Sequence, residues 1–160
     1  MERRATREEI DQIAWTTIKT ATVYPGPPYG YAHCGRPANY AELDQMIADL
    51  DGDFEHSWSE FLHEFFRYRT AEFFAEPPPK MLSPAWRVVL AGTAEYLSNE
   101  FGLPVPAWTE GREYFLPEIW DPLDDLGLNR TEFEEMRRAQ SHESFLRRNV
   151  IFKTRNLITL

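Results

Sequence analysis

Three side chains near the middle of the chain have the types that bind metal ions. His56, Glu60 and His63 would share one face of a helix, but the histidines are seven residues apart, about 10.5 Å along the helix axis. Zinc ligands lie about 2.0–2.1 Å from the metal, which favours residues three or four apart on one helix. His63-Glu64 also lacks the second histidine of a His-Glu-x-x-His zinc site. We therefore expect a polar helix face here, and predict no metal and no other cofactor.

The single cysteine, Cys34, is a potential nucleophile and follows His33 directly. A cysteine nucleophile needs a base that the fold brings to it. Side chains of adjacent residues usually point apart, so His33 is not that base. One cysteine also excludes an internal disulfide and a multi-thiolate metal site. We favour an incidental cysteine at this position.

A basic pair near the C-terminus could act in RNA cleavage. Arg137 and His142 are separated by four residues, which resembles the arginine-x4-histidine element of HEPN-type ribonucleases, also compact helical domains. That resemblance implies action on the scissile phosphate and the 2′-hydroxyl, usually in the shared cleft of a dimer. Guanidinium can stabilise phosphoryl charge, and imidazole can transfer protons near neutral pH. Against this hypothesis, Ser141 looks like a helix cap, which would break the helix expected to carry both residues.

The charge is divided between an acidic body and a basic C-terminal end. The chain carries a formal charge of −9, yet residues 137–156 contain six basic residues and one acid, so residues 1–136 carry −14. An acidic body disfavours broad contact with a phosphate backbone. The basic end could pack internally, contact a second copy or an acidic partner, or touch nucleic acid, and we favour internal packing. The candidate interaction residues there are Phe145, Arg147, Arg148, Lys153 and Arg155.

Helix signals dominate the elements that would position these residues. A Thr or Asn three residues before a Glu, the capping-box pattern, occurs at Thr6–Glu9, Asn39–Glu42 and Thr131–Glu134. A Ser-Pro pair at residues 83–84 and a glycine at 102 are typical of a helix start and end. The helices expected from these signals span about residues 6–21, 39–50, 54–74, 83–101 and 131–139, with a short sixth one capped by Ser141.

Residues 22–38 form the longest irregular stretch, with four prolines and three glycines. Loops longer than about 12–15 residues are uncommon and are often functional or disordered. The aromatic residues of this loop indicate that it packs on something. One hypothesis is therefore that the loop is a lid over an aromatic pocket that binds a small molecule.

The fold class predicted from these patterns is mainly α. We expect a single compact domain over residues 1–160 with about five to six helices. It has a helical N-terminal part, 1–53, and a second part, 54–160. The β-branched residues at 150–152 allow one short C-terminal strand.

Several segments of the second part follow one another in a recognisable order. They are Phe61-Leu62-His63-Glu64-Phe65-Phe66, Pro77-Pro78-Pro79, Ala94-Glu95-Tyr96-Leu97, Leu103-Pro104-Val105-Pro106-Ala107-Trp108, Phe115-Leu116 with Trp120, and Phe145-Leu146-Arg147-Arg148-Asn149-Val150-Ile151-Phe152. Over residues 54–152 this order resembles a largely uncharacterised bacterial domain. That domain is often found C-terminal to a Cro-type helix-turn-helix in regulators, and sometimes alone in settings suggestive of toxin–antitoxin systems. The resemblance implies a regulatory or protein-interaction domain.

Residues 1–53 depart from those regulators. Loop 22–38 stands where a helix-turn-helix needs a turn of three or four residues, so the resemblance does not imply DNA binding for this chain. The leading hypothesis is a non-enzymatic regulatory or interaction domain, antitoxin-like, with a protein partner or self-association. The HEPN-like ribonuclease and the small-molecule binder are the alternatives. Without an apolar span or a signal-peptide pattern, we expect a cytoplasmic protein that does not contact membranes.

Overall fold

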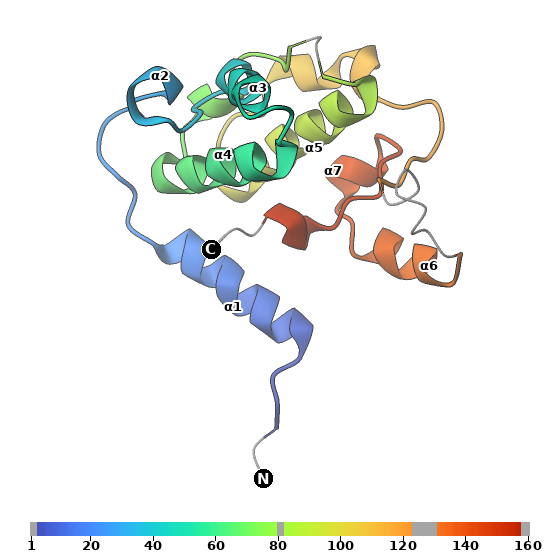
Figure 1. Ribbon diagram of the computed structural model, residues 1–160. Coiled ribbons are helices and arrows are strands. Elements are labelled where there is room, and N and C mark those ends of the chain that lie inside the picture. The colour runs from blue at the N-terminus through green and yellow to red at the C-terminus, as the bar shows by residue number, and fades with distance from the viewer. Residues whose placement is uncertain (1–2, 80–81, 123–130, 158–160) are drawn as a thin grey trace.

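A computed structural model describes residues 3–79, 82–122 and 131–157, except for the side chains of 131–134 and 155. This part of the chain is mainly α-helical, which confirms the predicted fold class (Figure 1). The α-helices are α1 (Arg7–Thr20), α2 (Tyr31–Cys34), α3 (Tyr40–Asp49), α4 (Phe54–Tyr68), α5 (Pro84–Glu100), α6 (Thr131–Ala139) and α7 (Glu143–Leu146). Short 3₁₀ helices are η1 (Ala71–Phe74), η2 (Ala107–Glu110), η3 (Arg112–Tyr114) and η4 (Thr154–Leu157).

The helix starts expected from local signals are present in α1 and α5. The Thr6 hydroxyl accepts a hydrogen bond from the Glu9 amide, and the Glu9 carboxylate accepts one from the Thr6 amide. Ser83 accepts from the Trp86 amide, with Pro84 in the first helical position. Both arrangements use donors that the first turn of a helix leaves without partners.

The capping pattern before α3 forms only in part. Asn39 accepts from the Glu42 amide as expected, but the Glu42 carboxylate accepts from the amides of Tyr31 (3.1 Å) and Ala38 (2.8 Å) instead of Asn39. Glu42 therefore holds both ends of the segment that contains α2, a short helix that the sequence did not predict. The start of the loop is also attached, because the Tyr24 amide donates to the Arg67 carbonyl.

Helix α4 is shorter than expected. It ends at Tyr68, and Arg69 adopts the left-handed conformation with φ +51°, so residues 71–74 form the separate helix η1. The guanidinium of Arg69 donates to the carbonyl oxygens of Phe66 and Lys19. A tertiary contact with α1 thus accompanies the break in the helix.

The core lies between α3, α4, η1 and α5 and is mostly aromatic. Phe61, Phe65, Phe73 and Phe74 have no exposed surface, and their rings pack at centroid distances of 5.0–6.0 Å. Tyr40 is also fully buried, and its hydroxyl donates to the carbonyl of Leu90 at 2.7 Å. A buried phenol needs such a partner, so this bond ties α3 to α5. Trp86, Trp108 and Trp120 are partly buried against this core.

The C-terminal segment differs from the expectation in two ways. Helix α7 is capped by His142 and not by Ser141, whose hydroxyl instead accepts from the Phe152 amide at 2.9 Å. The expected strand at 150–152 is represented, within the described residues, by two isolated β-bridges, Trp120 to Val150 and Ser141 to Lys153. Among the residues that the structure describes, neither bridge is extended into a sheet. In the described part of the chain, no helix combines the length and the apolar character that a membrane span requires.

Candidate binding cleft

Helix α1 is attached to the rest of the domain by its C-terminal half. The Trp15 ring packs against Phe66, Tyr96 and Phe101 at centroid distances of 5.8–6.1 Å. Ile18 is buried, and Lys19 pairs with Glu100 on α5. Figure 1 shows the N-terminal end of α1 directed away from the helices of the core.

The first half of α1 has an exposed apolar surface. Ile10 is 48% exposed and Ile13 is 64% exposed. Successive helical residues are rotated by about 100°, so Ile10 and Ile13 share one side, opposite to Glu8 and Gln12. We call Ile10 and Ile13 the outer stripe. Such spacing is typical of an apolar helix face that packs on a core, but the structure leaves Ile10 and Ile13 exposed.

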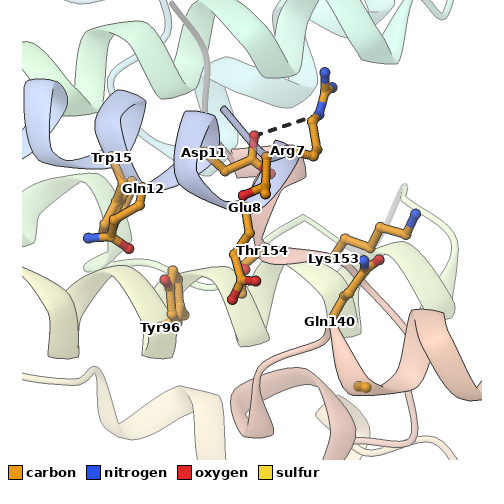
Figure 2. A pocket seen from close by; sticks show the side chains of 11 residues that line it. Arg7, Glu8, Asp11, Gln12, Trp15, Tyr96, Gln140, Lys153 and Thr154 are labelled. Atoms are coloured by element: carbon orange, nitrogen blue, oxygen red, sulfur yellow. Dashed lines mark ion pairs between the residues drawn. The ribbon is translucent and has the colours of Figure 1, made fainter. Parts of the chain in front are cut away.

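The opposite side of α1 faces the domain across a cleft of about 590 Å³. Its walls combine one side of α1 with side chains from α5, the end of α6 and the C-terminal segment (Figure 2). The lining residues are Thr6, Arg7, Glu8, Asp11, Gln12, Trp15, Tyr96, Ala139, Gln140, Lys153 and Thr154. Volumes of about 300–1,000 Å³ are typical of ligand sites, so the cleft is the candidate functional site.

Several polar side chains of the cleft have no partner among the described side chains. In the described part of the chain, the side chains of Glu8, Gln12, Gln140 and Lys153 make no hydrogen bond or ion pair with one another or with other described side chains. Arg7 differs because it lies 3.9 Å from Asp11 in an ion pair (Figure 2). The cleft therefore offers a carboxylate, an ammonium group and two amides to a ligand.

One end of the cleft is aromatic. The rings of Trp15 and Tyr96 stack at 6.1 Å with an interplanar angle of 29°, and the His142 ring lies 4.7 Å from Tyr96. Burial, and secondarily the charge of Glu100, raises the pKa of Tyr96 to about 12. Tyr96 is therefore neutral at physiological pH, and it provides an apolar ring surface to the cleft.

The predicted catalytic pair Arg137 and His142 is placed on two different elements. Arg137 lies in α6, and its buried guanidinium binds the buried carboxylate of Asp121, with Nε at 2.6 Å. His142 precedes α7, where its Nδ1 accepts from the Ser144 amide at 3.1 Å. The guanidinium is thus engaged in the interior and the imidazole caps a helix. This arrangement gives the ribonuclease hypothesis no support.

Phe145 and Arg148 are buried, which rules out an exposed role for these two candidate interaction residues in this structure. Phe145 packs on α5 beside Gly92 and has no exposed surface. Arg148 is also fully buried, and its Nη1 donates to the carbonyls of Thr109 (2.8 Å) and Tyr114 (3.4 Å). Burial lowers the pKa of Arg148, and the nearby charge of Glu95 opposes this effect.

Arg147 pairs with acids of the same chain. Its guanidinium binds Glu95 on α5 and Glu110 in η2, and these bonds raise the pKa of Arg147. The bond from Arg147 also lowers the pKa of Glu110. Arg147 and Arg148 thus both form ion pairs with acids of the same chain.

Lys153 is the candidate interaction residue that the structure places in the cleft. The side chain of Arg155 lies outside the described residues. Loop 22–38 lines neither this cleft nor the smaller pocket beside α6, so the described pockets do not support its role as a lid. No three His, Cys, Asp or Glu side chains of the described residues are grouped as a metal site requires. Sequence motifs could not reveal the cleft because its residues come from four separate segments.

The fold and the cleft define a mainly α-helical domain with a candidate binding site beside its first helix. Comparisons with known proteins find no matching family model, no significantly similar curated protein and no significantly similar solved structure. The resemblance over residues 54–152 stays a prediction, and the functional argument depends on the geometry of α1 and its surroundings.

Proposed function

We propose that this chain is a non-enzymatic protein-binding domain that presents the first half of α1 to a partner. The outer stripe, Ile10 and Ile13, is the observation that carries the proposal, because these side chains are 48% and 64% exposed on a helix whose other side faces a cleft. The resemblance to a bacterial domain implies a regulatory, antitoxin-like role, which agrees with this proposal.

The energetics of α1 favour a partner that covers it. Isolated helices shorter than about 12–15 residues are marginal in water. The side chains of α1 before Trp15 are exposed or half-buried, whereas its buried residue, Ile18, lies in the second half with Trp15 and Lys19. Full burial of an isoleucine side chain stabilises a complex by about 1.5–3 kcal/mol. An amphipathic helix with anchors at positions i and i+3 is the element that an apolar groove of another protein accepts.

Self-association through α1 alone is the weaker form of this proposal. Two isoleucines from each copy would bury far less than the roughly 1,200 Å² of a specific interface. The basic C-terminal end also favours neither a second copy nor nucleic acid, because Arg137, Arg147 and Arg148 already interact with acids of this chain. We therefore favour a different protein with an apolar groove.

The test is capture of the partner with matched variants. Tagged wild type, the double variant Ile10→Asp/Ile13→Asp, and Ile119→Asp are incubated with lysate of the native host, followed by mass spectrometry. Ile119 is 53% exposed elsewhere on the surface and controls for the loss of an exposed isoleucine. We expect one protein to bind wild type and Ile119→Asp but not the double variant. Calorimetry with that purified protein should then show a Kd at least about 100-fold weaker for the double variant.

Two results would contradict the proposal. In the first, the double variant, with the circular dichroism of wild type, binds the partner as tightly as wild type does. In the second, the purified chain cleaves RNA and loses this activity on His142→Ala, which would favour the ribonuclease alternative.

A further inference from the structure

We infer that the cleft beside α1 binds an extended peptide segment of the partner, with an apolar side chain at Trp15 and Tyr96 and an acidic side chain at Lys153. This inference rests on the proposed protein-binding function and names the chemistry of what is bound.

The shape of the cleft favours a peptide over a compact small molecule. It is a half-open groove between one side of α1 and the domain surface, with a volume of about 590 Å³. Small-molecule sites usually enclose about 70–90% of the ligand surface, which an open groove does not provide. An extended segment needs an open groove, because the chain must enter and leave the site.

The two ends of the cleft differ in chemistry. Figure 2 shows Trp15, Gln12 and Tyr96 toward one end, and Lys153 and Gln140 toward the other. The stacked rings of Trp15 and Tyr96 provide the apolar end. Lys153 provides an ammonium group that has no ion pair with any described residue. A ligand with one apolar and one acidic side chain complements both ends.

The polar groups along the cleft match a peptide backbone. Glu8 and Thr154 lie between the aromatic end and Lys153 in Figure 2. A carboxylate accepts hydrogen bonds, and the amides of Gln12 and Gln140 both donate and accept them. A peptide in extended form presents N–H and C=O groups in alternation, so it can satisfy donors and acceptors along one groove.

The experiment is an NMR titration of ¹⁵N-labelled full-length protein with blocked tetrapeptides. The probes are acetyl-Leu-Ala-Ala-Glu-amide, its glutamine analogue and its lysine analogue, each added to millimolar concentration. The indole N–H of Trp15 and the side-chain amides of Gln12 and Gln140 report on the cleft. We expect these signals to shift with the glutamate peptide, and the Kd of the glutamine analogue to be about fivefold weaker, as an exposed ion pair implies.

A charge exchange makes the test specific. Lys153→Glu should reverse the preference, so that the lysine peptide binds more tightly than the glutamate peptide. Arg112→Glu, which changes an exposed charge in η3, is the matched control and should keep the preference of wild type.

Three outcomes would overturn the inference. The first is that no peptide shifts the Trp15 indole signal, and the second is equal affinity of wild type for the glutamate and glutamine peptides. The third is that inorganic phosphate produces the same shifts, which would indicate an anion site. These outcomes do not decide the proposed function. If capture of the partner still depends on Ile10 and Ile13, the protein-binding proposal stands while the peptide inference fails.

Discussion

The guanidinium of Arg69 donates a hydrogen bond to the carbonyl oxygen of Ile18, 51 residues earlier in the chain. It also donates to the carbonyl of Lys19 at 3.0 Å and lies 5.4 Å from the ring centre of Phe101. The last carbonyls of a helix lack partners within the helix, and a cation near them is favourable. Arg69 therefore caps α1 from another element and helps to determine where α1 lies.

Removal of this cap should loosen α1. Arg69→Met keeps most of the side-chain length but removes the donors, so we expect the free energy of unfolding to fall by about 1.5–3 kcal/mol. Arg69→Lys keeps the charge without the planar fork and should have an intermediate effect. Urea denaturation gives the stabilities, and hydrogen exchange of the α1 amides reports the local effect. Unchanged exchange in α1 for Arg69→Met would show that the cap does not hold the helix.

Arg148 should be far more sensitive to substitution than Arg147. Arg148 is fully buried and interacts with Thr109, Tyr114 and Glu95. Arg148→Met should lower the free energy of unfolding by about 3 kcal/mol, because buried polar partners lose their donor. Arg147→Met, at a partly exposed position, should cost about 1 kcal/mol or less. Chemical denaturation compares the two, and equal losses would contradict the different roles given to these neighbours.

Gly92 is required by the contact between α5 and α7. A Cβ atom at this position would lie 2.6 and 2.8 Å from two ring carbons of Phe145. Gly92→Ala should therefore destabilise the protein by about 1–3 kcal/mol through overpacking, although alanine favours helices. Asn99→Ala, at an exposed position of the same helix, is the control and should be neutral or stabilising. In the Phe145→Leu background, Gly92→Ala should lower the free energy of unfolding by less than it does in wild type. An equal loss in both backgrounds would exclude the Phe145 ring as its cause.

The protein should lose stability in alkaline solution. Burial raises the pKa of Tyr96 to about 12 and the pKa of Tyr40 well above its usual value. Because an unfolded tyrosine ionises near pH 10, the contribution of these residues is complete below about pH 10 and is lost as the pH rises toward 12. Tyr96→Phe should flatten this decline between about pH 9 and 11.5, as measured by urea midpoints.

The control for this pH dependence is Tyr29→Phe, since Tyr29 is 74% exposed. It should follow the wild-type decline. A Tyr96→Phe profile parallel to that of wild type would mean that ionisation of Tyr96 does not contribute.

The helix starts were predictable because they depend on residues three or four positions apart. Thr6 with Glu9 and Ser83 with Pro84 carry their capping partners in the local sequence. The predicted end of α4 was wrong by several residues. The helix ends where Arg69 contacts α1, and no local pattern encodes that contact. The predicted cap of α7 was wrong by one residue: His142 caps the helix, since the Ser141 hydroxyl accepts a hydrogen bond from the Phe152 amide.

The features of the candidate site also fall into those that the sequence predicts and those that depend on how the helices pack. Composition and short-range periodicity are properties of the chain, so they were enough to predict the mainly helical fold, the acidic body and the basic C-terminal end. Helix packing, in contrast, places Arg147 and Arg148 against acids of the same chain, while Lys153 lines a cleft with Glu8. It also left Ile10 and Ile13 exposed. Such pairings join residues far apart in the chain, so they depend on how the helices pack and leave no local signal.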